Sequence, residues 1–210
     1  MKHSIEKVRI AVFVSGGGTN LQALLDAQKS GDLRSGEIVL VLSSSPDAYA
    51  LRRAEGAGVA TAVVSRRAMP DQDAFEAAIE AELAAHGIEL IVLAGFMSIL
   101  SPAFTARHEK RIINVHPSLI PSFCGKGFYG LRVHEAALAY GVKVTGATVH
   151  FVNEIPDGGE IILQKAVLVK EGDTPESLQR RVMEEAEWLL LPRAAEKVSA
   201  GIAGKKESKK

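Results

Sequence analysis

Two residues near the predicted end of a strand carry side chains suited to chemistry on a carbonyl group. Asn114 and His116 stand two positions apart, directly before Pro117. Residues at this spacing on a strand project to the same face. An amide can donate to a carbonyl oxygen, while an imidazole can move a proton or stabilise an oxyanion. The pair is a candidate site, although a core histidine beside a turn asparagine also fits.

Asp157 is the candidate partner for this pair. It lies in the turn-rich segment 153–159, NEIPDGG. A carboxylate beside an imidazole favours the charged imidazolium and raises its pKa. Spacing alone does not bring Asp157 to His116, and an aspartate in such a loop is commonly just a turn residue. His134 and His150 either line the same pocket or pack in the core. No histidine and acid spacing predicts a zinc site, so we expect no metal.

A glycine-rich turn, 15–20 (SGGGTN), separates a predicted strand from a predicted helix. Its backbone N–H groups and the helix N-terminus favour an anion, and Thr19 and Asn20 can add hydrogen bonds. The alternative is a plain strand–helix turn. Leu21 stands where a dinucleotide fingerprint needs its third glycine, and the P-loop G-K-[ST] is missing. The turn therefore favours a small phosphate ligand over NAD or ATP.

The surrounding elements alternate between apolar strands and amphipathic helices. Because the strands read as apolar on both faces, they predict a mostly parallel sheet with helices on both sides, a doubly wound α/β fold. Ligands bind such sheets at the carboxyl ends of the strands. The predicted strands cover 8–15, 37–43, 60–65, 90–94 and 111–115, and the helices cover 20–29, 48–57, 71–85 and 102–108.

The pattern changes after a long loop at 117–130. A helix is predicted over 131–140, and strands over 144–152 and 160–169 are joined by a turn, as in an antiparallel pair. Thr174 and Pro175 open a last helix. We expect a single domain over 1–203 and a disordered charged tail over 204–210.

Bulk properties exclude several classes of protein. Lys and Arg together number 25, as do Asp and Glu, so the net charge is zero, which argues against nucleic-acid or membrane-surface binding. The single cysteine, Cys124, allows no internal disulfide and suits a reducing compartment. The longest apolar run, 90–97, is too short to span a bilayer, and the N-terminus lacks a signal-peptide pattern. We expect a soluble cytoplasmic protein.

Four separate motifs resemble one enzyme family. They are 15–22 (SGGGTNLQ), 93–101 (LAGFMSILS), 114–121 (NVHPSLIP) and 146–152 (GATVHFV), the last followed by 157–159 (DGG). Together they resemble the phosphoribosylglycinamide formyltransferases of purine biosynthesis, and the resemblance runs from about residue 8 to 192. It implies a Rossmann-like formyltransferase fold, with 10-formyltetrahydrofolate as a co-substrate and no tightly bound cofactor. It also implies small-molecule partners only and a monomer or homodimer.

The resemblance assigns roles to particular residues. Asn114 would bind the formyl oxygen, His116 would act as the general acid, and Asp157 would keep His116 charged. The phosphoribosylglycinamide would be bound by Gly18, Thr19, Asn20 and Glu187. The folate would be bound by Met97, Ser98, Ile99, Leu100, Asn114, Asn153, Glu154, Ile155, Pro156 and Asp157.

The chain departs from the family pattern in three places. Many relatives carry arginine where Ser98 stands, and a basic residue where Gln72 stands. The loop after Pro121 is also longer. Lys126 or Arg132 is the expected replacement for the lost positive charge.

Three other activities compete with this interpretation. A formyltetrahydrofolate hydrolase would carry an extra N-terminal regulatory domain, whereas the first strand here begins at about Val8. A methionyl-tRNA formyltransferase would need a C-terminal RNA-binding domain and a basic surface. A non-catalytic phosphosugar-binding protein would keep the 16–20 turn but would not need Asn114, His116 and Asp157 together.

Overall fold

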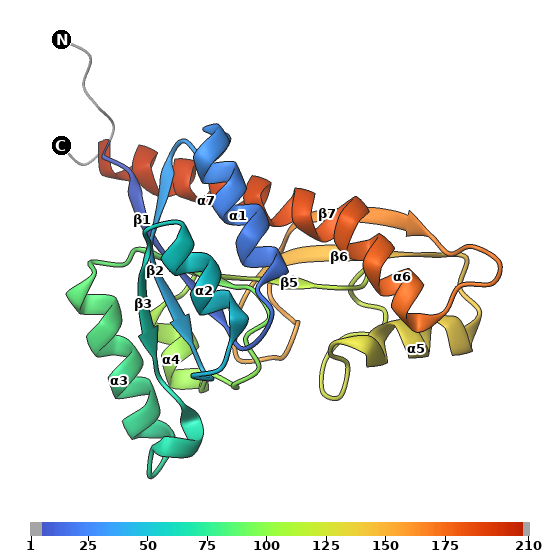
Figure 1. The fold of residues 1–210 in the computed structure, drawn as a ribbon, viewed down its shortest axis with the longest axis horizontal. Helices are drawn as coiled ribbons and strands as arrows, with labels where there is room; N and C mark the ends of the chain where they lie inside the picture. Colours follow the sequence, from blue (N-terminus) through green and yellow to red (C-terminus); the bar gives the residue numbers. More distant parts are fainter. Residues whose placement is uncertain (1–5, 208–210) are drawn as a thin grey trace.

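The computed structural model describes residues 6–207, which build one seven-stranded sheet flanked by helices (Figure 1). The strand order is β3-β2-β1-β4-β5-β6-β7. The strands are β1 (Val8–Val14), β2 (Gly36–Ser43), β3 (Ala60–Val63), β4 (Leu90–Leu93), β5 (Ile112–His116), β6 (Val144–Phe151) and β7 (Ile161–Leu168).

The sheet is parallel from β3 to β5 and antiparallel from β5 to β7. This arrangement confirms the predicted doubly wound fold with an antiparallel addition. One expectation was wrong: β3 is not apolar and buried on both faces, because it lies at the edge of the sheet and most of its residues are exposed.

Helices cover both faces because the central strands alternate between two cores. In β1, Val12 packs into one hydrophobic cluster and Phe13 into the other. The first cluster lies under α1, α2, α6 and α7, and the second under α3 and α4 (Figure 1). The helices are α1 (Thr19–Ser30), α2 (Tyr49–Gly56), α3 (Gln72–Ala85), α4 (Pro102–Arg107), α5 (Leu131–Tyr140), α6 (Pro175–Val182) and α7 (Trp188–Glu207), with the 3-10 turn η1 at Arg66–Ala68.

The order in which successive strands are added to the sheet reverses between β1 and β4, although the strands stay parallel. From β1 the chain proceeds outward to β2 and β3, then returns to β4 and continues to β5 on the other side. Connections therefore diverge at the carboxyl ends of β1 and β4, which is where such sheets form a binding crevice. The 15–20 turn follows β1 at this edge, and segment 94–101 follows β4.

The C-terminal helical region is more divided than the sequence predicts. A π-helical turn, η2 (Met183–Glu187), separates α6 from α7. Pro192, inside α7, has no N–H to donate to the carbonyl of Trp188. Helix α7 continues through Glu207, so residues 204–207 are helical rather than part of a disordered tail. Residues 208–210 lie outside the described residues. No helix within 6–207 is long and apolar enough to cross a membrane.

Candidate active site

Strands β5 and β6 place four polar side chains on one face. Asn114 and His116 end β5, and the antiparallel register sets His150 opposite Asn114 and Thr148 opposite His116. Asn114 Nδ2 lies 3.2 Å from His150 Nε2. Because His150 Nδ1 lies 2.8 Å from the Phe151 carbonyl, that nitrogen is the donor, and Nε2 of a neutral ring accepts from Asn114. His150 therefore orients the Asn114 amide.

Asp157 reaches the same cluster from the loop between β6 and β7. Its carboxylate oxygens lie 3.4 Å from His116 Nδ1 and 3.6 Å from His150 Nε2. The Gly125 N–H donates to Oδ2 at 2.9 Å. Asp157 adopts a left-handed backbone (φ 56°), a conformation that aspartate tolerates better than most residues. The structure thus brings together the three residues that the sequence could not join by spacing.

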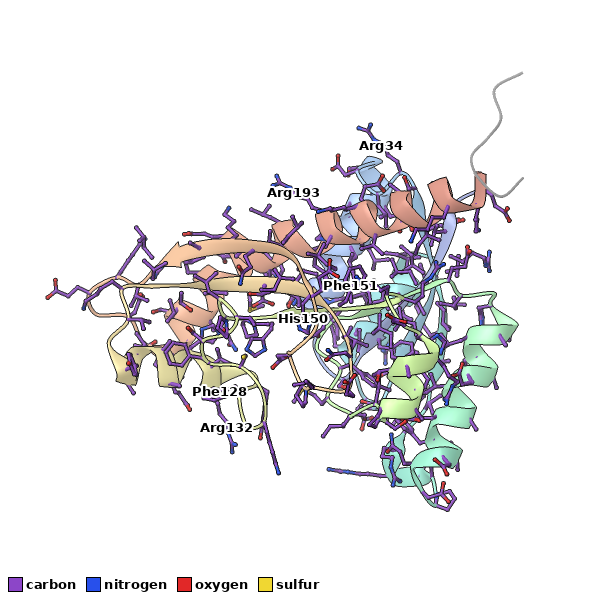
Figure 2. All side chains as sticks on the ribbon, turned by 180° about the vertical axis from the view of Figure 1, so that it is seen from behind. Arg34, Phe128, Arg132, His150, Phe151 and Arg193 are labelled. Atoms are coloured by element: carbon purple, nitrogen blue, oxygen red, sulfur yellow. The ribbon has the colours of Figure 1, made fainter. Side chains whose placement is uncertain are left out.

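The long loop after β5 closes over the second nitrogen of His116. The Phe123 carbonyl oxygen lies 2.9 Å from His116 Nε2. Arg132, at the start of α5, has its guanidinium 5.0 Å from the Tyr129 ring. Figure 2 shows His150 in the interior of the molecule, whereas Arg132 projects at its edge. The Ile120–Pro121 peptide is cis, a point that the sequence leaves open.

The electrostatics of His116 differ from the expectation. Burial lowers its pKa more than the Asp157 carboxylate and the Phe123 carbonyl raise it, so the pKa lies below the ordinary 6.5. For Asp157, burial favours the neutral acid, but the interactions with the His150 ring, His116 and the Gly125 N–H outweigh it, so its pKa is lowered. At pH 7 the pair therefore comprises a carboxylate and a mostly neutral imidazole. Asp157 raises the pKa of His116 as predicted, but the expectation that it keeps the imidazole charged was wrong, because burial, which sequence does not reveal, has the larger effect.

His134 is buried behind this cluster on α5. Its side chain is fully buried, and neither ring nitrogen has a hydrogen-bond partner within the described residues. Burial and the neighbouring His116 lower its pKa to about 4. His134 is therefore a neutral core histidine at physiological pH.

The glycine-rich turn is built with its N–H groups open. Its carbonyls are bound from α2, since Ala50 N–H donates to Gly16 and Arg53 Nε donates to Gly17. Gly18 has a φ of 72°, and a Cβ there would lie 2.6 Å from Ala50 Cβ. Helix α1 begins at Thr19 with no side-chain cap. The first N–H groups of α1 thus remain available to an anion.

Glu187 joins this turn from the far end of the chain. Asn20 Nδ2 donates to Glu187 Oε2 at 2.7 Å. Glu187 is buried in the π-helical turn, and burial raises its pKa to about 6 against the opposing effect of Asn20. A cavity of about 410 Å³ beside the turn is lined by Thr19, Gln22, Ala23, Asp26, Arg53 and Trp188.

Two segments near the polar cluster expose apolar side chains. Met97 and Ile99, after β4, are 59% and 82% exposed, and Ile155, before Asp157, is 57% exposed. Backbone contacts fix the first segment: Met97 N–H donates to Ser15 Oγ, and Ser101 N–H donates to Glu76. Phe96, Leu100 and Val152 pack against one cluster, so both segments adjoin the same apolar core. Exposed apolar side chains on a backbone that is fixed in this way suit the binding of a flat, partly apolar ligand.

Sequence reasoning missed the supporting contacts of this site. The structure adds Thr148, the Phe123 carbonyl and the Gly125 N–H to the predicted residues, and of the two alternatives for His150 it supports the pocket. The alternation of Thr148 and His150 was the available signal, but their register against β5 was not predictable. Within residues 6–207, no group of three or more His, Cys, Asp or Glu side chains is placed to hold a metal ion.

The chain is similar over most of its length to proteins of a known family. The profile of a family described as formyl transferase matches residues 8–194. Phosphoribosylglycinamide formyltransferase of Haemophilus influenzae is 41% identical over 88% of this chain and 84% of its own length. The trifunctional purine biosynthetic protein adenosine-3 of Gallus gallus is 45% identical over 95% of this chain. The chain spans only 19% of the length of that larger relative.

Solved structures share the fold as well as the sequence. Glycinamide ribonucleotide transformylase 1 from Symbiobacterium toebii is 44% identical and has a TM-score of 0.86, covering 93% of this chain and 89% of its own. Phosphoribosylglycinamide formyltransferase from Brucella melitensis is 42% identical with a TM-score of 0.85, covering 93% of this chain and 97% of its own. The residues matched by the family profile, 8–194, include all seven strands and the polar cluster.

Proposed function

The chain belongs to the formyl transferase family, and on that premise we propose that it transfers the formyl group of 10-formyltetrahydrofolate to the amine of phosphoribosylglycinamide, a step of purine biosynthesis. One observation carries the proposal. Asn114, His116 and Asp157 converge at the carboxyl end of β5. The anion-binding turn after β1 and the exposed Met97 and Ile99 after β4 follow strands at the same edge, and Ile155 stands two positions before Asp157.

The 16–20 turn and Glu187 are proposed to bind the phosphosugar. The phosphate accepts hydrogen bonds from the open N–H groups at the start of α1, where the helix dipole favours negative charge. Glu187 and Asn20 are hydrogen-bonded to each other at this turn and present acceptors to the ribose hydroxyl groups. This arrangement directs the amine of the nucleotide towards the end of β5.

The folate is proposed to lie between segments 97–100 and 153–157. Met97, Ile99 and Ile155 cover its ring systems, which replaces water on both sides of an apolar surface. The backbone groups of both segments supply polar contacts. The formyl group is then placed beside Asn114, which keeps one amide N–H for the formyl oxygen while the other faces His150.

The reaction is proposed to be direct acyl transfer without a covalent enzyme intermediate. The neutral amine attacks the formyl carbon and gives a tetrahedral oxyanion, which Asn114 stabilises. The proton lost by the amine passes to His116, whose imidazolium is stabilised by Asp157 at 3.4 Å. His116 then donates this proton to N10 of the folate as the C–N bond breaks. The enzyme ends in its starting protonation state.

The low pKa of His116 fits this cycle. At rest the buried ring is mostly neutral and ready to accept a proton. When the oxyanion forms nearby, its negative charge favours the imidazolium and raises the pKa of His116. The same side chain thus acts as base and then as acid.

One assay tests the proposal against its rivals. The protein is mixed with 10-formyltetrahydrofolate, with and without phosphoribosylglycinamide, and release of tetrahydrofolate is followed. Release that requires the nucleotide is the expected result, with formylated nucleotide in equal amount. Release without the nucleotide would instead identify a hydrolase, and no release in either mixture would leave a binding protein.

A further inference from the structure

Arg66, in the 3-10 turn η1, is a half-buried cation without an acidic partner. Its Nε donates to Gln72 Oε1 at 3.2 Å, and one terminal nitrogen donates to the Met69 carbonyl at 3.2 Å. Both acceptors are neutral, and no carboxylate within residues 6–207 forms an ion pair with Arg66. A guanidinium is always charged and carries five donors. Most of its donors therefore remain for a ligand.

Gln72 connects this cation to the folate-flanking segment. Its Nε2 donates to the Ile99 carbonyl at 3.0 Å and to Glu76 Oε1 at 2.7 Å. Two successive hydrogen bonds thus join the Arg66 guanidinium to the backbone of Ile99. Since Ile99 is 82% exposed, the cation stands at the border of the exposed apolar surface.

Glu76 does not neutralise Arg66. Its buried carboxylate already accepts from the Ser101 N–H and hydroxyl, both at 2.6 Å, as well as from Gln72. Ser98 and Gln72 are themselves neutral. Arg66 is therefore the cation that the described structure holds nearest to segment 97–100 through hydrogen bonds.

We propose that Arg66 binds a carboxylate of the glutamyl tail of 10-formyltetrahydrofolate, with Gln72 fixing the guanidinium. The inference rests on the proposed function, because it needs the folate rings to lie on Met97 and Ile99. The tail then leaves the apolar segment where Gln72 and Arg66 stand. A guanidinium matches a carboxylate through two parallel hydrogen bonds, which give both affinity and direction. Arg66 is thus a specificity-determining residue, and the loop residues Lys126 and Arg132 are not needed for this role.

The test compares Arg66→Ala with the wild type on two folates: 10-formyltetrahydrofolate and the same compound with both glutamyl carboxylates converted to amides. Loss of a charge-assisted hydrogen bond of this kind weakens binding roughly tenfold or more. We expect Arg66→Ala to raise the KM for the natural folate by about that factor at nearly unchanged kcat. On the diamide, variant and wild type should be equal. A variant that merely disturbs segment 97–100 would lose affinity for both folates.

Three further variants sharpen the comparison. Arg67→Ala removes the exposed neighbour on the same turn and should leave both KM values unchanged. Arg66→Lys should recover part of the affinity, and Gln72→Arg should restore affinity in the Arg66→Ala protein by returning a guanidinium to this edge. Thermal unfolding of each variant verifies folding.

The results separate this inference from the proposed function. Normal formyl transfer by the wild type, with equal KM values for wild type and Arg66→Ala, would overturn the Arg66 assignment alone. If the wild type transfers no formyl group, the Arg66 assignment is tested instead by equilibrium binding of the natural folate and of the diamide to the wild type and to Arg66→Ala. Arg66-dependent preference for the carboxylates would support the site, and equal binding would overturn it.

Discussion

His116 is held by contacts on both ring nitrogens, and its role can be tested directly. We expect His116→Ala to lower kcat by about a hundred- to ten-thousandfold, the usual contribution of a general acid–base group. Steady-state kinetics with saturating substrates measure the effect. His86→Ala, at the opposite edge of the sheet before β4, is the matched control and should keep full kcat. A His116→Ala enzyme with wild-type kcat would refute the assignment.

The Asp157 carboxylate should be visible in the pH profile. Because the pKa of His116 lies below 6.5, the acidic limb of kcat/KM should fall below that pH. Asp157 raises the pKa of His116, so Asp157→Asn should move this limb to still lower pH while also lowering kcat. Rates measured from about pH 5 to 8 would show the shift. A limb that moves upward, or stays in place, would contradict the electrostatic role of Asp157.

For individual residues, the sequence predicted which side chains form the candidate site but not their burial or their hydrogen-bond partners. Alternation placed Asn114 and His116 on one face, and the structure agrees. The depressed pKa of His116 was beyond reach, because it depends on burial by a loop that begins after Pro117. The contribution of His150 depends on which residue of β6 faces Asn114, and that register is a long-range property.

Among the elements, α6 is fixed to the end of β7 by an ion pair. Arg181 donates to Asp173 at 2.5 Å and to the Leu168 carbonyl at 3.0 Å, while Asp173 also accepts from Ser177. The Arg181 guanidinium holds the pKa of Asp173 well below its usual 3.8. The pair's stabilisation is therefore present above about pH 3.8 and is lost only as the pH falls further.

Breaking this pair should loosen the C-terminal helices. Arg181→Met leaves a largely buried carboxylate without its cation and should lower the free energy of unfolding by about 2 kcal/mol at pH 7. Urea unfolding measures the loss. Arg180→Met, at the exposed neighbouring position, should change stability by less than about 0.5 kcal/mol. Equal losses in the two variants would show that the ion pair is not the cause.

Elements bounded by clear turn chemistry were the most predictable. Gly31 and Gly141 end helices in the left-handed conformation, and Asp71 caps α3, so those boundaries agree closely with the sequence. The π-helical turn at Met183–Glu187 had no comparable signal. A predicted single helix from Thr174 therefore became three segments, although this turn is what positions Glu187.

Across the whole molecule, the contact between Asn20 and Glu187 joins α1 to the π-helical turn η2 that precedes α7. The pKa of Glu187 is raised from 4.5 to about 6, so the folded protein holds a proton that the unfolded chain releases earlier. Stability from this group is complete below about pH 4.5 and declines as the pH rises through 6. The loss amounts to about 2 kcal/mol, from 1.36 kcal/mol per pKa unit.

Glu187→Gln removes this pH dependence while keeping an acceptor for Asn20. Relative to the wild type, the variant should gain about 2 kcal/mol of unfolding free energy between pH 4.5 and 7.5. Denaturant unfolding at several pH values measures the difference, and Glu184→Gln, exposed in the same π-helical turn, is the control. Parallel stability curves for wild type and Glu187→Gln would rule out the buried carboxylate as the source.

The sequence separation of this contact also sets the time between the synthesis of its two residues. Asn20 and Glu187 are separated by 167 positions, and ribosomes add about 5–20 residues per second. The glycine-rich turn is therefore translated roughly 8 to 33 seconds before its partner. The strand bearing Asn114 and His116 emerges in between. Asn114, His116 and Asp157 are therefore all synthesised before Glu187, and the proposed sugar-binding site is the last to have all its residues.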